Sequence, residues 1–123
     1  MNPVRTLIAA AAALLGAAAV VSAQPAEEPG CDGSTYEMVE CLMAKTAVWD
    51  KRLNDAYRAA LNAALPKQRD QLRTAQRLWV QYRDANCLYW GLGEGTIARI
   101  EAGDCHYRLT RARAEELEGI GRN

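Results

Sequence analysis

Apolar residues recur every three or four positions along most of the chain from Ser34 onward, and this spacing predicts helices rather than strands. The first helix is predicted to begin at "STYE", residues 34–37. There Ser34 can cap the helix while Glu37 reaches back, which is the capping-box pattern. The helix is predicted to end at Leu65, because the proline that follows disfavours helical geometry in the residue before it.

Two further helices follow from the same spacing. A second is predicted over 66–90, since proline is tolerated in a first helical turn. The glycine-rich "GLGEG" at 91–95 breaks it before a third helix over 97–118. Short connections make consecutive helices antiparallel. The sequence therefore predicts an all-α domain over 34–118, with an antiparallel helical hairpin plus a third helix, and a frayed C-terminus at 119–123.

The first 23 residues predict export. A short basic start precedes an apolar run over 7–21, and small residues follow it at the positions that signal peptidase reads. The run is short for a membrane span and rich in weakly apolar alanine. We expect 1–23 to be a signal peptide cleaved after Ala23. The remaining 100 residues would then carry no membrane anchor, and would lie in the periplasm of a Gram-negative-type envelope or outside the cell.

Charge is balanced in amount but not in position. After cleavage the chain holds 14 basic and 15 acidic residues, and this near-neutral charge argues against nucleic-acid binding. Residues 24–41 hold five acids and no base, whereas 67–83 hold five bases and one acid. Residues 24–33 are also rich in proline and glycine, so we expect a flexible acidic lead segment there.

Four cysteines remain after cleavage, and an even number in an exported chain predicts two disulfides. A zinc site would need closer pairs than the gaps of 10, 46 and 18 residues offer. Folding the first two helices about Pro66 brings Cys41 level with Cys87. This favours Cys41–Cys87 with Cys31–Cys105, and the alternative is Cys31–Cys87 with Cys41–Cys105. The sequence alone does not fix the connectivity.

A polar stripe runs along the second predicted helix. Residues three and four apart share a helix face, so Arg83 lies one turn beyond Trp79, where a guanidinium can stack on an indole. In the hairpin, Asp50 comes within about one turn of Arg83, and a buried arginine needs such a carboxylate. Asp84 and Glu101 are the other candidate partners. We interpret the stripe and its counterpart on the first helix as a structural polar core of Asp50, Asn54, Tyr57, Gln76, Trp79 and Arg83.

Three segments together resemble the LprI-type lysozyme-inhibitor-like domain family. They are "LNDAY" at 53–57, "AQRLWVQYRDANC" at 75–87 and "CHYRLTRARAEEL" at 105–117. The resemblance covers about 31–117, and it implies a small exported helical domain whose named activity is inhibition of lysozyme. The chain departs from the lipoprotein member behind that name, because no lipidation cysteine follows its apolar run. It also has "GEGT" where Gly-Gly-Ser is more usual.

Catalysis is not predicted. The one histidine, His106, has no nucleophile recognisable beside it, and Ser34 is assigned to the helix cap. No metal or cofactor motif is present in the sequence. The acidic stretch from Glu27 to Glu40 and the loop before the third helix are features that could meet a partner. We treat this loop as a candidate binding loop made of Gly93, Glu94, Gly95, Thr96 and Arg99.

The leading hypothesis is therefore an exported, non-enzymatic binding protein that inhibits lysozyme-type muramidases by blocking the cleft, with lysozyme as the expected protein partner. One alternative is a structural or adaptor protein that binds another envelope protein. The other is a cell-wall glycan binder that uses Trp49, Trp79 and Trp90 as stacking platforms.

Overall fold

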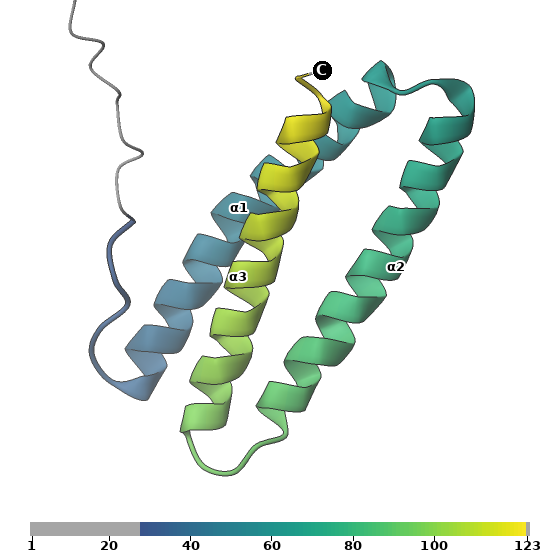
Figure 1. The fold of residues 1–123 in the computed structure, drawn as a ribbon. Coiled ribbons are helices and arrows are strands. Elements are labelled where there is room, and N and C mark those ends of the chain that lie inside the picture. The colour runs from purple at the N-terminus through teal and green to yellow at the C-terminus, as the bar shows by residue number, and fades with distance from the viewer. Residues whose placement is uncertain (1–27, 123) are drawn as a thin grey trace, which may run out of the picture.

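A computed structural model describes residues 28–122, and it consists of three helices (Figure 1). They are α1 (Thr35–Ala63), α2 (Pro66–Gly91) and α3 (Ile97–Ile120). Each boundary lies within two residues of its predicted place, and no strand occurs in 28–122, so the predicted all-α fold is confirmed. The predicted signal peptide and the first residues of the lead segment lie outside the described residues.

The helix ends form as local chemistry predicts. At α1 the Glu37 amide donates to Ser34 Oγ at 3.3 Å, and the Ser34 amide donates to Glu37 Oε2 at 2.7 Å, which completes the capping box. At the other end Arg69, from the first turn of α2, donates to the Leu61 and Ala64 carbonyls. This arginine satisfies two of the acceptors that the end of α1 leaves free.

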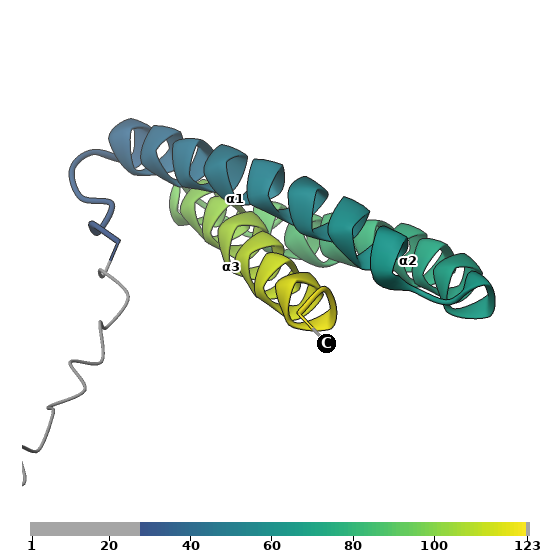
Figure 2. The ribbon, with the colours of Figure 1, turned by 90° about the horizontal axis from the view of Figure 1, so that it is seen from above.

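The three helices do not share their contacts equally. α1 and α3 point the same way and pack along most of their length, while α2 runs antiparallel to both (Figure 1). α2 packs against α3 and barely touches α1, although a short turn joins it to α1. Figure 2 shows the α1–α2 turn standing away from the C-terminal end of α3. The predicted hairpin is present in the path of the chain, but α3 holds its two arms together.

The apolar core lies between α1 and α3. Its small side chains include Ala60 and Ala114, both fully buried, and they let the two helices approach closely. Gly103 serves the same purpose lower down, where an added Cβ would lie 3.3 Å from the Leu42 side chain. The core cluster consists of Trp49, Leu53, Ala56, Ala60, Ala114 and Leu117. α2 contributes no buried residue to this cluster and packs against it only through the half-buried Leu72 and Trp79, so its apolar attachment is limited.

The disulfides join Cys31 to Cys41 and Cys87 to Cys105, with S–S distances of 1.98 and 2.07 Å. Both predicted connectivities, Cys41–Cys87 with Cys31–Cys105 and Cys31–Cys87 with Cys41–Cys105, are therefore wrong. The prediction assumed that α2 packs beside α1, with Cys87 at the height of Cys41. The antiparallel neighbour that α2 contacts is instead α3. The other bridge closes locally, because the turn at Gly33 (φ 111°) brings Cys31 back onto α1.

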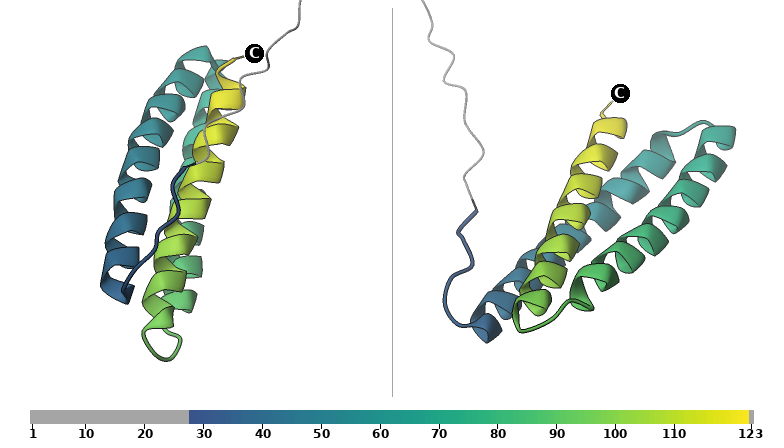
Figure 3. Two further views of the ribbon diagram at one scale, coloured as in Figure 1. Left: turned by 90° about the vertical axis from the view of Figure 1, so that its left-hand side faces the viewer. Right: turned by 60° about the horizontal axis from the view of Figure 1, so that its bottom comes forward.

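The lead segment makes contacts that sequence reasoning missed. The Glu28 carboxylate accepts hydrogen bonds from Trp49 Nε1, at 2.7 Å, and from the Tyr107 hydroxyl. The bond from Tyr107 is the main cause that lowers the pKa of Glu28. This carboxylate therefore ties residues N-terminal to the first disulfide to both α1 and α3, as the left view of Figure 3 shows for the path of the chain.

The pairing of the four cysteines can be tested by tryptic digestion of the unreduced protein. Residues 28–44 contain no lysine or arginine, so Cys31 and Cys41 are expected within one peptide that ends at Lys45. Cys87 and Cys105 are expected to link peptide 84–99 to peptide 100–108. Mass spectrometry that finds the Lys45 peptide bridged to either of the other two would contradict the structure.

Candidate functional site

Three of the predicted polar-core residues, Gln76, Trp79 and Arg83, lie at the contact between α2 and α3. We call this contact the polar interface (Gln76, Trp79, Arg83, Thr110 and Arg113). Arg113 is its most buried charge, with 9% of its side chain exposed. Its Nε donates to Gln76 Oε1 at 3.0 Å, and its Nη1 donates to Glu116 Oε2 at 2.7 Å. A buried guanidinium is costly unless it is paired and hydrogen-bonded, and both conditions are met here.

Arg83 occupies the middle of the polar interface, with 17% of its side chain exposed. Its Cζ lies 5.1 Å from the centroid of the Trp79 ring, so the expected guanidinium–indole stack forms. Its Nε donates to Asp84 Oδ1 at 3.0 Å, and Nη1 donates to Thr110 Oγ1 at 3.4 Å. Asp50 Oδ1 lies 3.9 Å from Nη1, so this carboxylate attracts the guanidinium across the gap between α1 and α2.

The other predicted members of the polar core lie at its edge. Asp50 and Asn54 are exposed, and Asn54 Nδ2 donates to Asp50 Oδ2 at 3.3 Å. Tyr57 is half-buried and packs against the apolar core. The structure therefore brings Asp50 and Arg83 together but places Asn54 at the surface, where it holds the Asp50 carboxylate.

Two residues of the polar interface were missed, Thr110 and Arg113. Both lie on α3 and are buried, with Thr110 fully so. The signal was present in the sequence, since Thr110, Arg113, Ala114 and Leu117 are spaced three, four and seven apart and share one face of the helix. A polar pair on an otherwise buried face marks a helix that meets a polar stripe on its neighbour.

The candidate binding loop is exposed throughout. Gly93, Glu94, Gly95, Thr96 and Arg99 all lie at the surface, at the end of the molecule beside the Cys87–Cys105 bridge. Gly95 has φ 76°, which lies in the left-handed region that favours glycine. The loop thus connects α2 to α3 without contributing to the polar interface.

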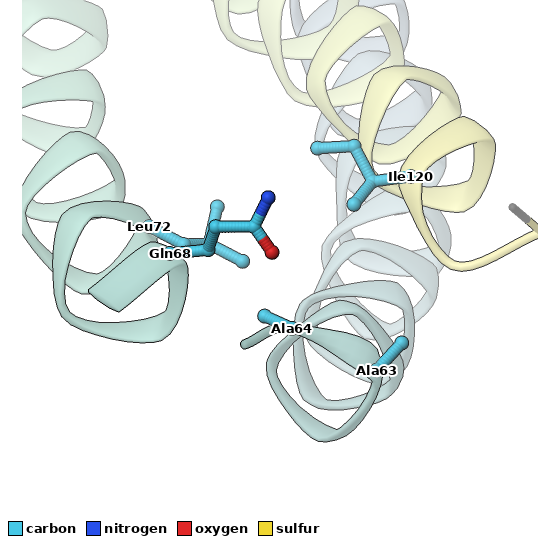
Figure 4. A pocket seen from close by; sticks show the side chains of 5 residues that line it. All are labelled: Ala63, Ala64, Gln68, Leu72 and Ile120. Carbon is cyan, nitrogen blue, oxygen red and sulfur yellow. The ribbon is translucent and has the colours of Figure 1, made fainter. Parts of the chain in front are cut away.

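Two shallow hollows flank these elements. One, of about 480 Å³, lies between the α1–α2 turn and the end of α3, and is lined by Ala63, Ala64, Gln68, Leu72 and Ile120 (Figure 4). The Gln68 amide, which is its one polar side chain, already accepts a hydrogen bond from the Leu65 amide through Oε1. This hollow therefore offers little besides apolar walls, and no pair of groups for acid–base chemistry.

The second hollow, of about 420 Å³, lies where all three helices meet and is lined by Met43, Thr46, Ala47, Asp50, Arg83, Gly103 and His106. Burial is the main cause that lowers the pKa of His106, and the nearby positive charge of Arg83 lowers it further. The Asp50 carboxylate, which also lines this hollow, is paired with Arg83 and accepts a hydrogen bond from Asn54. In residues 28–122 no three His, Cys, Asp or Glu side chains are grouped to hold a metal ion.

The polar interface and the two disulfides define the class of protein, a small three-helix domain stapled by disulfides. A sequence model of the family described as "Lysozyme inhibitor LprI" matches residues 27–117, so the chain belongs to the LprI family. The chain is also 36% identical over 91 residues to an uncharacterized protein of Rhizobium meliloti. That match covers 70% of this chain and 58% of the relative, so the chain spans little more than half of the relative's length. No solved structure matches.

The Gln76–Arg113 hydrogen bond is expected to stabilise the attachment of α2. Gln76→Ala or Arg113→Ala should each lower the free energy of unfolding by about 2 kcal/mol, because each leaves a buried polar partner without its bond. The double variant should lose less than the sum of the two, by about 1 kcal/mol. Arg73→Ala, an exposed arginine on the same helix, is the control and should leave urea unfolding unchanged. Fully additive losses would contradict a direct interaction.

His106 is expected to make stability depend on pH. Because its pKa is lowered in the native protein, the unfolded chain binds the proton more tightly. Its contribution to stability is therefore complete above the unfolded pKa of about 6.5 and is lost as pH falls through that value toward the native pKa. His106→Gln should flatten the change in urea midpoint between about pH 5 and about pH 8. An NMR titration that places His106 at or above its ordinary pKa would contradict this.

Proposed function

We propose that this protein is an exported, non-enzymatic binding protein that inhibits a lysozyme-type muramidase by blocking access to its cleft. The observation that carries the proposal is the family match over 27–117, nearly all of the described domain. Export is supported by the predicted signal peptide and by the two disulfides, which persist in oxidising compartments such as the periplasm.

The polar side chains make structural hydrogen bonds within the domain, and this supports binding rather than catalysis. Arg113 donates to Gln76 across the contact between α2 and α3, and Arg83 donates to Thr110, so these side chains hold the domain together. Ser34 is committed to the cap of α1, since its hydroxyl accepts from the Glu37 amide. A hydrolase needs a nucleophile or carboxylate pair presented to a cleft. Ser34 is instead held in the helix cap, and within residues 28–122 no such pair lines either hollow.

The shape of the domain suits steric inhibition. The α2–α3 connection is an exposed loop on a base fixed by the Cys87–Cys105 bridge. A loop held on a rigid base loses little conformational entropy when it binds, which favours affinity. Inhibition then needs no chemistry from this chain, because occupation of the cleft excludes the glycan.

The tryptophans give little support to the alternative of glycan stacking. Trp49 is 5% exposed, with the Arg52 and Arg111 guanidinium carbons 4.4 and 5.2 Å from its ring centroid. Trp79 is half-buried and stacked with Arg83. Trp90 alone of the three is exposed, and one ring is a poor platform for a glycan chain.

A lysozyme assay tests the proposal. The purified, oxidised mature protein should slow digestion of cell walls by a basic c-type lysozyme at micromolar concentration, and calorimetry should show a one-to-one complex. A short soluble chitooligosaccharide substrate should be protected as well, because the enzyme itself is blocked. The reduced and alkylated protein is the control, and it should not inhibit.

Protection of cell walls alone, without protection of the soluble substrate, would instead indicate a glycan binder. Unchanged rates on both substrates, together with no heat of binding, would reject inhibition and favour a role as an adaptor for another envelope protein.

A further inference from the structure

The charges of the domain separate along its long axis. The start of α1 and the α2–α3 connection lie at the same end of the molecule (Figures 1 and 3). We call this end, made of residues 31–44 and 84–104, the disulfide end. It holds seven acidic residues and one base, Arg99, whereas the rest of the described chain holds seven acids and thirteen bases.

Most of the acidic charge at the disulfide end is available to a partner. Two of the acids form ion pairs within the domain, Asp84 with Arg83 and Asp104 with Arg108. The other five are exposed and pair with no base within residues 28–122: Asp32, Glu37, Glu40, Glu94 and Glu101. The field at this end is therefore negative, and it attracts positively charged surfaces at a distance.

Large apolar side chains gather at the same end. Leu92 is 75% exposed and Tyr89 is 71% exposed, although both are of types that proteins usually bury. The exposed set at the disulfide end is Tyr36, Met43, Leu88, Tyr89, Trp90, Leu92 and Ile97. Exposed apolar patches rimmed by polar residues are typical of protein interaction sites, and tyrosine and tryptophan are enriched among the residues that dominate binding energy.

The geometry beneath this apolar set is fixed. Cys87, one residue before Leu88, is fully buried and bridged to Cys105 on α3. The Tyr89 and Trp90 rings meet edge to face with centroids 5.3 Å apart, and the Gly93 amide donates to the Trp90 carbonyl at 3.2 Å. Side chains already ordered before association lose less entropy on binding.

From these observations we propose that the disulfide end is the docking surface, with Leu88, Tyr89 and Leu92 as apolar anchors, and that its partner is a muramidase with a positively charged face. This inference rests on the proposed function and names the surface that carries it. Charge complementarity orients the encounter, because the opposite end carries Arg69, Arg73 and Arg77 and would be repelled by the same partner. The acidic field thus speeds association, and the apolar anchors slow dissociation.

The test compares two triple variants of the mature protein for binding to a basic c-type lysozyme. Leu88→Ser, Tyr89→Ser and Leu92→Ser together should raise Kd by about 30-fold or more, because they remove the anchors. The matched control is Val48→Ser, Leu65→Ser and Leu78→Ser, which are 67%, 66% and 60% exposed and lie outside the disulfide end. It should stay within about threefold of the parent. Circular dichroism and thermal melts verify that both variants are folded.

A second comparison tests the charge. Glu40→Gln, Glu94→Gln and Glu101→Gln together should lower the association rate constant and its dependence on salt. Arg73→Gln and Arg77→Gln should not lower that rate constant. If the parent protein inhibits lysozyme and the anchor variant binds within about threefold of it, the docking surface is wrong while the proposed function stands. If the parent neither binds nor inhibits, the proposed function and the docking surface are both wrong.

Discussion

The attachment of α2 to α3 is the contact on which the three-helix arrangement depends. α1 and α3 share an apolar core, but on α2 only Gln76 and Cys87 are buried. Apolar burial is the usual reason that a helix stays on its neighbour, and for α2 it is limited to the half-buried Leu72 and Trp79. The disulfide at Cys87 and the hydrogen bond from Arg113 to Gln76 add to it, one fixing each half of the helix. A small domain with a limited core needs such covalent and polar supports.

This arrangement separates what identifies the family from what would act on a partner. The family resemblance rests on segments whose polar members, Gln76, Arg83 and Arg113 among them, lie at the polar interface. Residues that carry the family resemblance therefore also hold the helices together. The surface at the disulfide end is a different set of residues, made of exposed apolar side chains and exposed acids. Substitutions at this proposed docking surface would leave the polar interface unchanged.

Much of the fold could be predicted because its signals are local. The capping box at Ser34, the proline at 66 and the glycines after Trp90 set the helix ends within two residues. The Trp79–Arg83 stack also follows from spacing along one helix, and the approach of Asp50 to Arg83 followed from the hairpin path.

The predictions that were wrong were those that required knowing which helices pack against each other. The cysteine pairing assumed that α2 packs beside α1, whereas α2 packs against α3. The buried face of α3 was not predicted to include Thr110 and Arg113. The Glu28 contacts with Trp49 and Tyr107 join residues 21 and 79 positions apart, and nothing in the composition of the lead segment indicates them. The apolar anchors near the loop were likewise hidden by their helical spacing, which is the same for a buried and an exposed residue.

Hydrogen exchange of the backbone amides tests most directly whether α2 is held by the disulfide and the polar interface rather than by the core. The experiment compares the oxidised protein with its Cys87→Ala, Cys105→Ala variant. The account predicts that the amides of α2 lose much of their protection in the variant, while those of α1 and α3 around Trp49 and Leu117 keep theirs. Equal loss across all three helices, or unchanged protection of α2, would contradict it.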